Sequence, residues 1–419
     1  MGSSMGTVVA LEPSAARQQR GGDGREKIAL VLGGGGVTGG VYTVGALRAL
    51  DLLAVNRTVN QFDVYLGTSS GSVVAALAAN GVSTEEMMRA VIADGPSQLR
   101  DIGARTLLTP NLGGLARSGA RLPLALAELA YDLARARGGA SVIDALLGFA
   151  DAAPSGLYTT AGIERYVRNA LAGPARTDDF RELARELYIA ATDLDSSERV
   201  IFGEPGWDDV AISRAVGAST ALPVLYAPVR VRGRELIDGG VVSTTNLDVA
   251  AAHGATLIVV VNPLVPYDND LRRRVRTLRG ERPRRVSDLG FTQVAYQSFK
   301  LLAHQRLHER RESWAQRFPG VDIILIEPDR SDEVMFETSL MSYSSRIEIA
   351  RHGFRSVTHQ LAGEYDRIKE VCARHGVEIS ATRVRSVLEH VAPEREPTHG
   401  WRRIFEQTTA ALLRQAGGA

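Results

Sequence analysis

The stretch that decides the fold is Phe62-Asp63-Val64-Tyr65-Leu66-Gly67-Thr68-Ser69-Ser70-Gly71, followed by Val73-Val74-Ala75-Ala76-Leu77-Ala78-Ala79. Its opening apolar run is typical of a short buried strand, and the alanine-rich run is typical of a packed helix. A turn this tight strains the backbone at Ser69, which the glycines at Gly67 and Gly71 permit. The strain holds the Ser69 hydroxyl out at the helix N-terminus, where free amides favour developing negative charge. We interpret this segment as the nucleophile elbow of a serine acyl hydrolase.

Length and composition set limits on the class of protein. The chain has 419 residues, of which 44% are hydrophobic and 23% charged, as in a globular protein with one large domain or two ordinary ones. A formal net charge of +1 gives no overall field that would attract nucleic acid. The single cysteine, Cys372, excludes an intramolecular disulfide. Residues 1–24 contain no continuous apolar segment of the secretory type, so we expect a cytoplasmic protein.

The alternation of strands and helices predicts the fold class. Largely continuous apolar runs, typical of strands covered on both faces, recur at 28–32, 62–66, 187–191, 256–261 and 321–326. Helical stretches separate these runs, which predicts a three-layer α/β/α sandwich with a mostly parallel central sheet. Residues 229–231 and 234–237 predict a hairpin with a two-residue turn at Arg232-Gly233.

The remaining segments divide the chain into regions. Residues 1–26 are expected to form a disordered tail, and 27–361 the main domain. Within that domain, residues 95–155 interrupt the strand–helix alternation as a helical insertion, which either packs on the domain or forms a mobile cap over a pocket. Residues 362–419 are expected to form a helical extension, with helices near 364–374 and 401–415.

A glycine-rich loop, Gly33-Gly34-Gly35-Gly36-Val37-Thr38-Gly39-Gly40, follows the first strand and precedes a helix expected at 41–53. Without side chains in the way, its backbone N–H groups can converge on one small anion. Residues 34–39 also satisfy the G-x-G-x-x-G pattern of dinucleotide sites, but the next strand does not end in Asp or Glu. A phosphate-binding P-loop would need Lys after the last glycine, where the chain has Val41.

The base that would take the proton of Ser69 has two candidates. Asp238 ends a hairpin strand and precedes Gly239 and Gly240, which allow close backbone approach. In a dry site, such a carboxylate can act alone as a general base. A Ser…Asp…His triad would need one of the eight histidines, which all follow Asp238; His253 precedes a strand, at the wrong end for a site at strand C-termini.

The order of these three motifs resembles the patatin-like phospholipase family. A glycine-rich loop follows the first strand, G-x-S-x-G follows the second, and Asp238-Gly239-Gly240 comes late. The resemblance extends over about 27–361 and is supported by 214–223, which are similar to the family's Ala-Ser…Pro segment. It implies a Ser69–Asp238 dyad, an oxyanion hole formed by the amides of Gly34, Gly35, Gly36 and Val37, and metal-free, cofactor-free hydrolysis of a lipid acyl ester.

Two departures from the family's pattern leave the dyad intact. The loop usually carries a cation before its final glycine, where this chain has Thr38-Gly39. Asn246-Leu247-Asp248 takes the place of the usual Asn-x-Pro. Two other interpretations stay open: an acyltransferase that uses the same dyad, and a non-catalytic protein that binds lipid or nucleotide.

A cluster of arginines lies between the predicted strands at 256–261 and 321–326. Arg272–Arg285 contain eight arginines and one acid, Glu281. Such a stretch is either a solvated loop or a surface that binds anionic lipid headgroups. In the second case the protein would bind a membrane peripherally. The sequence does not indicate the oligomeric state.

Overall fold

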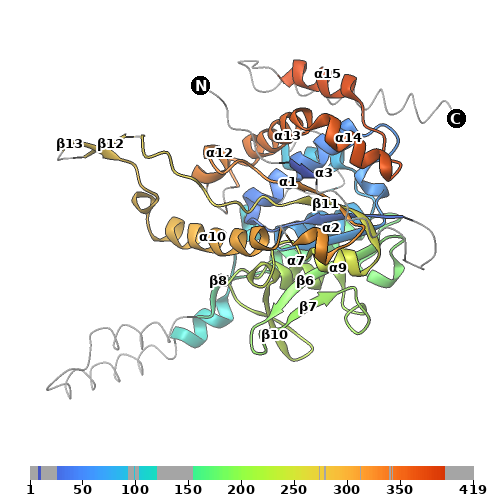
Figure 1. The fold of residues 1–419 in the computed structure, drawn as a ribbon. Helices are drawn as coiled ribbons and strands as arrows, with labels where there is room; N and C mark the ends of the chain where they lie inside the picture. Colours follow the sequence, from blue (N-terminus) through green and yellow to red (C-terminus); the bar gives the residue numbers. More distant parts are fainter. Residues whose placement is uncertain are drawn as a thin grey trace.

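The described part of the chain forms a nine-stranded sheet between two layers of helices (Figure 1). The computed structural model describes residues 8–10, 26–92, 99, 103–119, 154–272, 274–277, 280–311, 313–338, 341 and 343–391. The strand order is β1-β14-β11-β2-β3-β6-β10-β9, and β7 also pairs with β6. The strands are β1 (Val8–Ala10), β2 (Lys27–Leu32), β3 (Val64–Thr68), β6 (Glu186–Asp193), β7 (Arg199–Phe202), β9 (Val229–Val231), β10 (Arg234–Asp238), β11 (Ala255–Val261) and β14 (Asp322–Ile326).

The middle of the sheet is parallel, as the sequence predicts. Strands β14, β11, β2, β3 and β6 run in one direction, whereas β1, β7 and β10 are antiparallel to their neighbours. Because β2 and β3 are buried on both faces, they lack polar alternation, and their polar residues lie only at one end of each strand, Lys27 and Thr68. Strands β9 and β10 form the expected hairpin, with Arg232 (φ 51°) and Gly233 (φ 79°) in its turn.

Helices cover both faces of the sheet and produce two separate apolar cores. One face packs against the larger layer: α1 (Gly36–Leu53), α2 (Ser70–Ala79), α3 (Thr84–Ile92), α7 (Ala161–Leu171), α8 (Ile212–Ser219), α13 (Arg346–Gly363), α14 (Tyr365–Arg374) and α15 (Ala381–Val391). The other face packs against α9 (Leu247–Ala252), the second half of α10 (Phe291–Arg311) and the segment of α11 (Trp314–Arg317). The expected three-layer α/β/α fold is confirmed.

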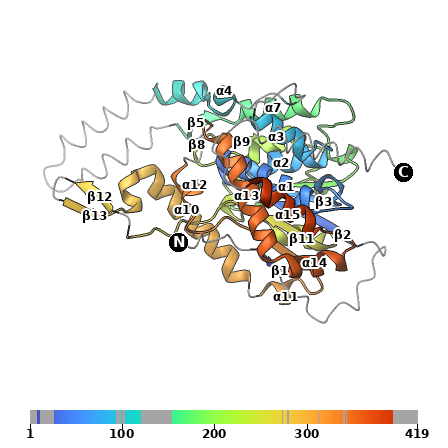
Figure 2. The ribbon, with the colours of Figure 1, turned by 90° about the horizontal axis from the view of Figure 1, so that it is seen from above.

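Smaller elements decorate the ends of the sheet. A three-stranded sheet contains β4 (Thr109–Pro110), β5 (Gly156–Thr159) and β8 (Val224–Tyr226), and α4 (Ala104–Leu107) precedes it. The hairpin of β12 (Arg274–Thr277) and β13 (Gly280–Pro283) projects beyond the start of α10 in both views (Figure 2). The short elements are η1 (Val59–Gln61), η2 (Phe180–Glu182), η3 (Gly239–Val241), η4 (Val286–Leu289) and α12 (Glu333–Glu337).

Three expectations about segments need correction. The tail expected at 1–26 is not wholly disordered, because Val8–Ala10 pair with the open edge of β14. The glycine loop is shorter than expected: α1 begins at Gly36, since packing overrides the low helix propensity of its glycines. The arginine-rich stretch is not a plain loop but contains the β12–β13 hairpin.

Other segment predictions are tested only in part. Most of the helical insertion expected at 95–155 lies outside the described residues, as does the helix expected at 401–415. Helix α14 agrees with the helix expected at 364–374, whereas α15 was not predicted. Among the described residues, no helix combines the length and the apolar character that crossing a bilayer requires.

Helix α13 completes the larger core by packing closely against α1. A Cβ atom added at Gly45 of α1 would lie 2.3 Å from the Ala350 carbonyl oxygen. One added at Gly353 of α13 would lie 2.6 Å from the Tyr42 carbonyl oxygen. These glycines therefore let the two backbones approach, and a larger residue at either position must push the helices apart.

We expect Gly353→Ala to lower the free energy of unfolding by about 1–3 kcal/mol, because the new methyl group overlaps the backbone of α1. Gly363→Ala, at the end of the same helix, is the matched control because no atom lies within 4 Å of its added Cβ. The control should leave stability unchanged or raise it by up to about 1 kcal/mol. Urea unfolding followed by circular dichroism compares the two, and equal stabilities would contradict the close packing.

Candidate active site

Ser69 lies in the tight turn between β3 and α2, as the sequence predicts. Its backbone has φ 54° and ψ −130°, a strained conformation for a residue with a side chain. The flanking glycines are required by close packing: a Cβ at Gly67 would lie 2.4 Å from the Cα of Ser72, and one at Gly71 would lie 2.3 Å from the Leu32 carbonyl oxygen. The turn therefore has the geometry of a nucleophile elbow.

Hydrogen bonds from two further serines hold this strained turn. The backbone N–H of Ser69 donates to the Ser219 hydroxyl (2.9 Å), which in turn donates to the carbonyl oxygen of Ala190 (2.6 Å). The Ser72 hydroxyl donates to the Ser69 carbonyl oxygen (2.6 Å). Sequence reasoning did not assign a role to Ser219, although the segment 214–223 that contains it was part of the family resemblance.

Asp238 lies at the end of β10, two strands from Ser69. The sheet register sets Asp238 opposite Ala191 of β6, whose neighbour Ala190 is opposite Thr68 of β3. The Asp238 carboxylate accepts a hydrogen bond from the Gly240 N–H (2.8 Å), and the Ser69 hydroxyl lies close enough to it to lower the pKa of Asp238. The structure therefore brings together the two residues that the sequence proposes as a dyad.

The electrostatic environment makes Asp238 a stronger base than an ordinary aspartate. Its side chain is buried, with the residue 2% exposed, and this burial raises the pKa of Asp238 to about 6. The Ser69 hydroxyl and the Gly240 amide favour the charged carboxylate and offset part of that effect. At neutral pH the carboxylate is thus deprotonated, with a proton affinity that suits a general base.

The segment after Asp238 is tied back to the elbow. Gly239 packs so closely against β6 that its Cβ would lie 2.3 Å from the Ala190 carbonyl oxygen. Asn246, in a left-handed conformation (φ 49°), donates from Nδ2 to the Thr68 hydroxyl (3.0 Å). The Arg199 guanidinium donates to Asn246 Oδ1 (3.0 Å) and binds the carboxylate of Asp248. Asn246 and Asp248 therefore connect this segment to β3 and β7.

The glycine turn after β2 lies directly against Ser69. A Cβ at Gly34 would be 2.8 Å from the Ser69 Cβ. Gly35 (φ 152°) caps α1, and Gly36 (φ 62°) and Val37 form its first turn. The first N–H groups of a helix have no acceptor within the helix, so these amides are available to an anion. The structure thus places all four predicted oxyanion residues beside the serine.

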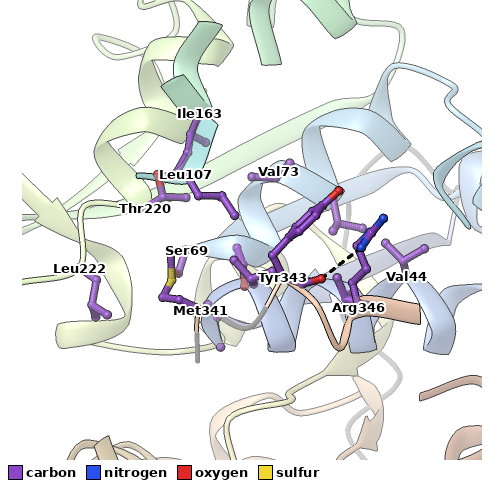
Figure 3. A pocket seen from close by; sticks show the side chains of 18 of the residues that line it. Val44, Ser69, Val73, Leu107, Ile163, Thr220, Leu222, Met341, Tyr343 and Arg346 are labelled. Atoms are coloured by element: carbon purple, nitrogen blue, oxygen red, sulfur yellow. Dashed lines mark hydrogen bonds between the residues drawn. The ribbon is translucent and has the colours of Figure 1, made fainter. Parts of the chain in front are cut away.

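A largely apolar cavity of about 160 Å³ opens onto Ser69, Asp238 and the glycine turn (Figure 3). Most of the side chains come from the larger helical layer, and the rest come from α4, the start of α10 and the segments after α8, after β11 and before α13. They include Val44, Val73, Val74, Leu77, Met87, Val91, Leu107, Ile163, Leu222, Leu264, Tyr296, Phe299 and Met341. A cavity with this lining suits a hydrocarbon chain.

Arg346 contributes a cation to the described lining of the cavity, which the sequence did not predict. Its guanidinium lies 4.1 Å from the ring centroid of Tyr343 and donates to the Tyr343 carbonyl oxygen (3.4 Å). Position 38, where the family's loop cation was expected, is a buried threonine. The cavity therefore has a positive charge on another element, at the start of α13.

The structure places His253 away from this site. Its Nδ1 lies 2.9 Å from the Tyr188 hydroxyl, and its carbonyl oxygen accepts a hydrogen bond from Lys27, the first residue of β2. Ser69 and the glycine turn follow the opposite ends of β3 and β2. No histidine is found among the described residues that line the cavity.

Comparison with known proteins places this arrangement in a family. The family model "Patatin-like phospholipase" matches residues 30–251, which is more than half of the chain. The chain belongs to the patatin-like phospholipase family. The matched region holds the glycine turn, Ser69 and Asp238, whereas β11, β14 and α13 lie beyond it.

Two solved structures are similar over most of the chain. One is VipD from Legionella pneumophila, with 14% sequence identity, a TM-score of 0.34, and coverage of 87% of this chain and 71% of VipD. The other is the heterodimeric ExoU–SpcU complex from the type III secretion system of Pseudomonas aeruginosa, with 14% identity and a TM-score of 0.24. That match covers 88% of this chain and 67% of the other.

The raised pKa of Asp238 predicts the pH dependence of ester turnover. A base must be deprotonated to accept the Ser69 proton, so kcat/KM should fall about tenfold per pH unit below pH 6 and level off above it. A pH profile on a short soluble ester measures this inflection. His253→Asn is the control and should leave the inflection unchanged. Loss of the inflection in a histidine variant would contradict a carboxylate base.

Proposed function

We propose that this protein is a serine acyl hydrolase that cleaves fatty-acyl ester bonds of phospholipids or lysophospholipids. The observation that carries the proposal is the placement of the strained Ser69 elbow and the buried Asp238 carboxylate together at the wall of one apolar cavity, where Ser69 lowers the pKa of Asp238. Membership of the patatin-like phospholipase family supports the same reaction class. In this proposal Ser69 is the nucleophile and Asp238 the base.

The reaction would proceed through an acyl-enzyme. Asp238 accepts the hydroxyl proton as Ser69 Oγ attacks the ester carbonyl carbon, and the oxygen of that carbonyl becomes an anion. The amides of Gly35, Gly36 and Val37 stabilise this oxyanion, helped by the N-terminal end of α1. The C–O bond to the alcohol then breaks, and protonated Asp238 returns the proton to the leaving oxygen. Water then attacks the acyl carbon with Asp238 again as base, the bond to Ser69 Oγ breaks, and Asp238 returns the proton to Ser69 as the fatty acid leaves.

The cavity supports a lipid as the substrate. Its aliphatic and aromatic side chains would take an acyl chain, with a gain of about 0.8 kcal/mol for each methylene group removed from water. The Arg346 guanidinium would attract an anionic group such as a headgroup phosphate. Acyl transfer to an alcohol other than water would use the same residues, and products from mixed lipids distinguish the two reactions.

We expect Ser69→Ala and Asp238→Asn each to abolish ester turnover without loss of the fold, because the two residues act as one unit. The double variant should be no less active than either single variant. A fluorophosphonate probe should label the wild type. It should label Asp238→Asn far more slowly, and it should not label Ser69→Ala at all. Product analysis on phospholipids, lysophospholipids and neutral esters then identifies the bond that is cleaved.

Two outcomes would contradict this proposal. Substantial turnover in Asp238→Asn would mean that another group activates Ser69. Thermal stabilisation of the protein by a nucleotide, without probe labelling, would indicate instead a non-catalytic binding protein that uses the glycine turn. Ser70→Ala is a matched control for the probe, since Ser70 is the adjacent serine and begins α2.

We further propose that the protein binds anionic membranes peripherally through the arginine-rich hairpin. Strands β12 and β13 project next to the start of α10, whose Tyr296 and Phe299 line the cavity. Exposed apolar residues lie on the same part of the chain: Leu271, Leu289, Val294, Leu301 and Leu302. Positive charge beside exposed apolar side chains is typical of surfaces that dock on lipid.

Neutralising Arg272, Arg273 and Arg274 together should weaken binding to phosphatidylserine vesicles roughly a hundredfold, since each charge contributes about 1 kcal/mol. Turnover of a short soluble ester should not change. Replacing the exposed Arg355, Arg367 and Lys369 of α13 and α14 by Gln is the charge-matched control and should have little effect. Vesicle sedimentation at low and high salt measures the binding of both variants. Equal binding by the wild type and the hairpin variant would contradict the proposal.

A further inference from the structure

A second group of chemically active side chains lies outside the cavity, between α10 and the end of β14. His304 and His308 are one turn apart on α10, so both imidazoles point to the same side of the helix. Glu327 follows the last residue of β14. One ligand atom from each of the three side chains lies within 4.8 Å of the other two. The imidazole ring centroids are 3.9 Å apart.

The carboxylate of this cluster is buried and fixed. The Glu327 side chain is 5% exposed, and its Oε1 accepts a hydrogen bond from Asn262 Nδ2 (2.7 Å). Its Oε2 lies 3.0 Å from His308 Nε2. The Glu327 carbonyl oxygen accepts a hydrogen bond from Gln360 of α13 (3.1 Å). Outer hydrogen bonds of this kind orient the carboxylate of a metal ligand.

His304 does not fit a purely structural hydrogen-bond network. Its Nδ1 is buried and has no hydrogen-bond partner, which costs free energy in a folded protein. This nitrogen is therefore available as a metal ligand, and the fold of α10 and β14 places the His304 side chain beside those of His308 and Glu327. A neutral imidazole with an unused lone pair is the form that binds a metal ion.

We propose that His304, His308 and Glu327 bind a divalent first-row transition metal ion, for which Zn²⁺ is the best match. Two imidazole nitrogens and one carboxylate oxygen are a known ligand set for Zn²⁺ and leave a fourth position for water. Bonds of about 2.0–2.1 Å put tetrahedral ligand atoms roughly 3.3 Å apart. The observed 3.0 Å between His308 and Glu327 is close to that spacing. Nitrogen donors disfavour Mg²⁺ and Ca²⁺.

A metal ion here would stabilise the architecture around the cavity. It would join α10, which carries Tyr296 and Phe299, to the C-terminal end of β14. Asn262, the partner of Glu327, also lies against the glycine turn: its Oδ1 would be 3.0 Å from a Cβ at Gly33. The ion would thus restrain a wall of the cavity and the strand end behind the glycine turn, without contact with the ester.

The test is metal binding by the full chain, prepared without a polyhistidine tag and dialysed against EDTA. Zn²⁺ should bind with one-to-one stoichiometry in calorimetry and raise the melting temperature by about 3–6 °C at a hundredfold excess over Kd. Co²⁺ should give the visible absorption of tetrahedral coordination. Mg²⁺ and Ca²⁺ should produce neither effect.

Variants of the two histidine ligands distinguish Zn²⁺ binding at this site from Zn²⁺ binding at other histidines. His304→Asn and His308→Gln should each weaken Zn²⁺ binding roughly a hundredfold or more and abolish the Co²⁺ absorption. His352→Gln is the matched control, because His352 also contacts a carboxylate, that of Asp332, and its side chain is 27% exposed, against 26% for His308. Circular dichroism verifies the fold of each variant.

Zn²⁺ binding that is unchanged in both ligand variants, or an absence of saturable binding in the wild type, would overturn the assignment. Equal loss in His352→Gln would also overturn it. None of these measurements depends on ester turnover, so the metal site and the proposed hydrolase function can fail or succeed separately.

Discussion

The burial of the Asp238 carboxylate beside the Ser69 hydroxyl is the constraint on which the rest of the site depends. A carboxylate removed from water is costly unless hydrogen bonds stabilise it. Here the Gly240 amide donates to it, and the nearby Ser69 hydroxyl also favours the charged form. This partial compensation leaves the carboxylate deprotonated yet basic, and the strand order β3-β6-β10 brings it within reach of the elbow.

The elbow can hold its serine because neighbouring backbones approach it without side chains between them. Gly34 lies against one side of Ser69, and Gly71 against the backbone at the end of β2. The Ser219 hydroxyl fixes the Ser69 amide from a third direction. A strained conformation persists only where its surroundings determine it this fully. The direction of the hydroxyl is therefore determined by the elbow together with the end of β2, the glycine turn and Ser219, and not by the elbow alone.

The sequence predicted the parts of this structure that local chemistry determines. Continuous apolar runs identified the parallel strands, and glycine spacing identified the positions of Ser69 and Asp238. The start of α1 at Gly36 was missed, because tertiary packing rather than propensity makes these glycines helical. Strand β1 was missed because its three residues acquire structure only by pairing with β14. The contacts of Ser219, Asn246 and Arg346 were not predicted, although the family resemblance had included 214–223 and 246–248, because contacts between distant segments leave no local pattern.

The packing of α13 on α1 has a consequence for how the chain acquires its structure during synthesis. Strand β2 lies in the middle of the sheet, yet its neighbour β11 and the helix that covers α1 come more than 200 residues later. Ser69 and Asp238 both leave the ribosome before α13 does, while the apolar face of α1 is still exposed. Long-range pairing of this kind folds slowly and leaves apolar surface open to aggregation. A nascent chain that stops at the end of the matched family region therefore contains every proposed reacting group but lacks α13, α14 and α15, three of the eight described helices in the larger apolar layer.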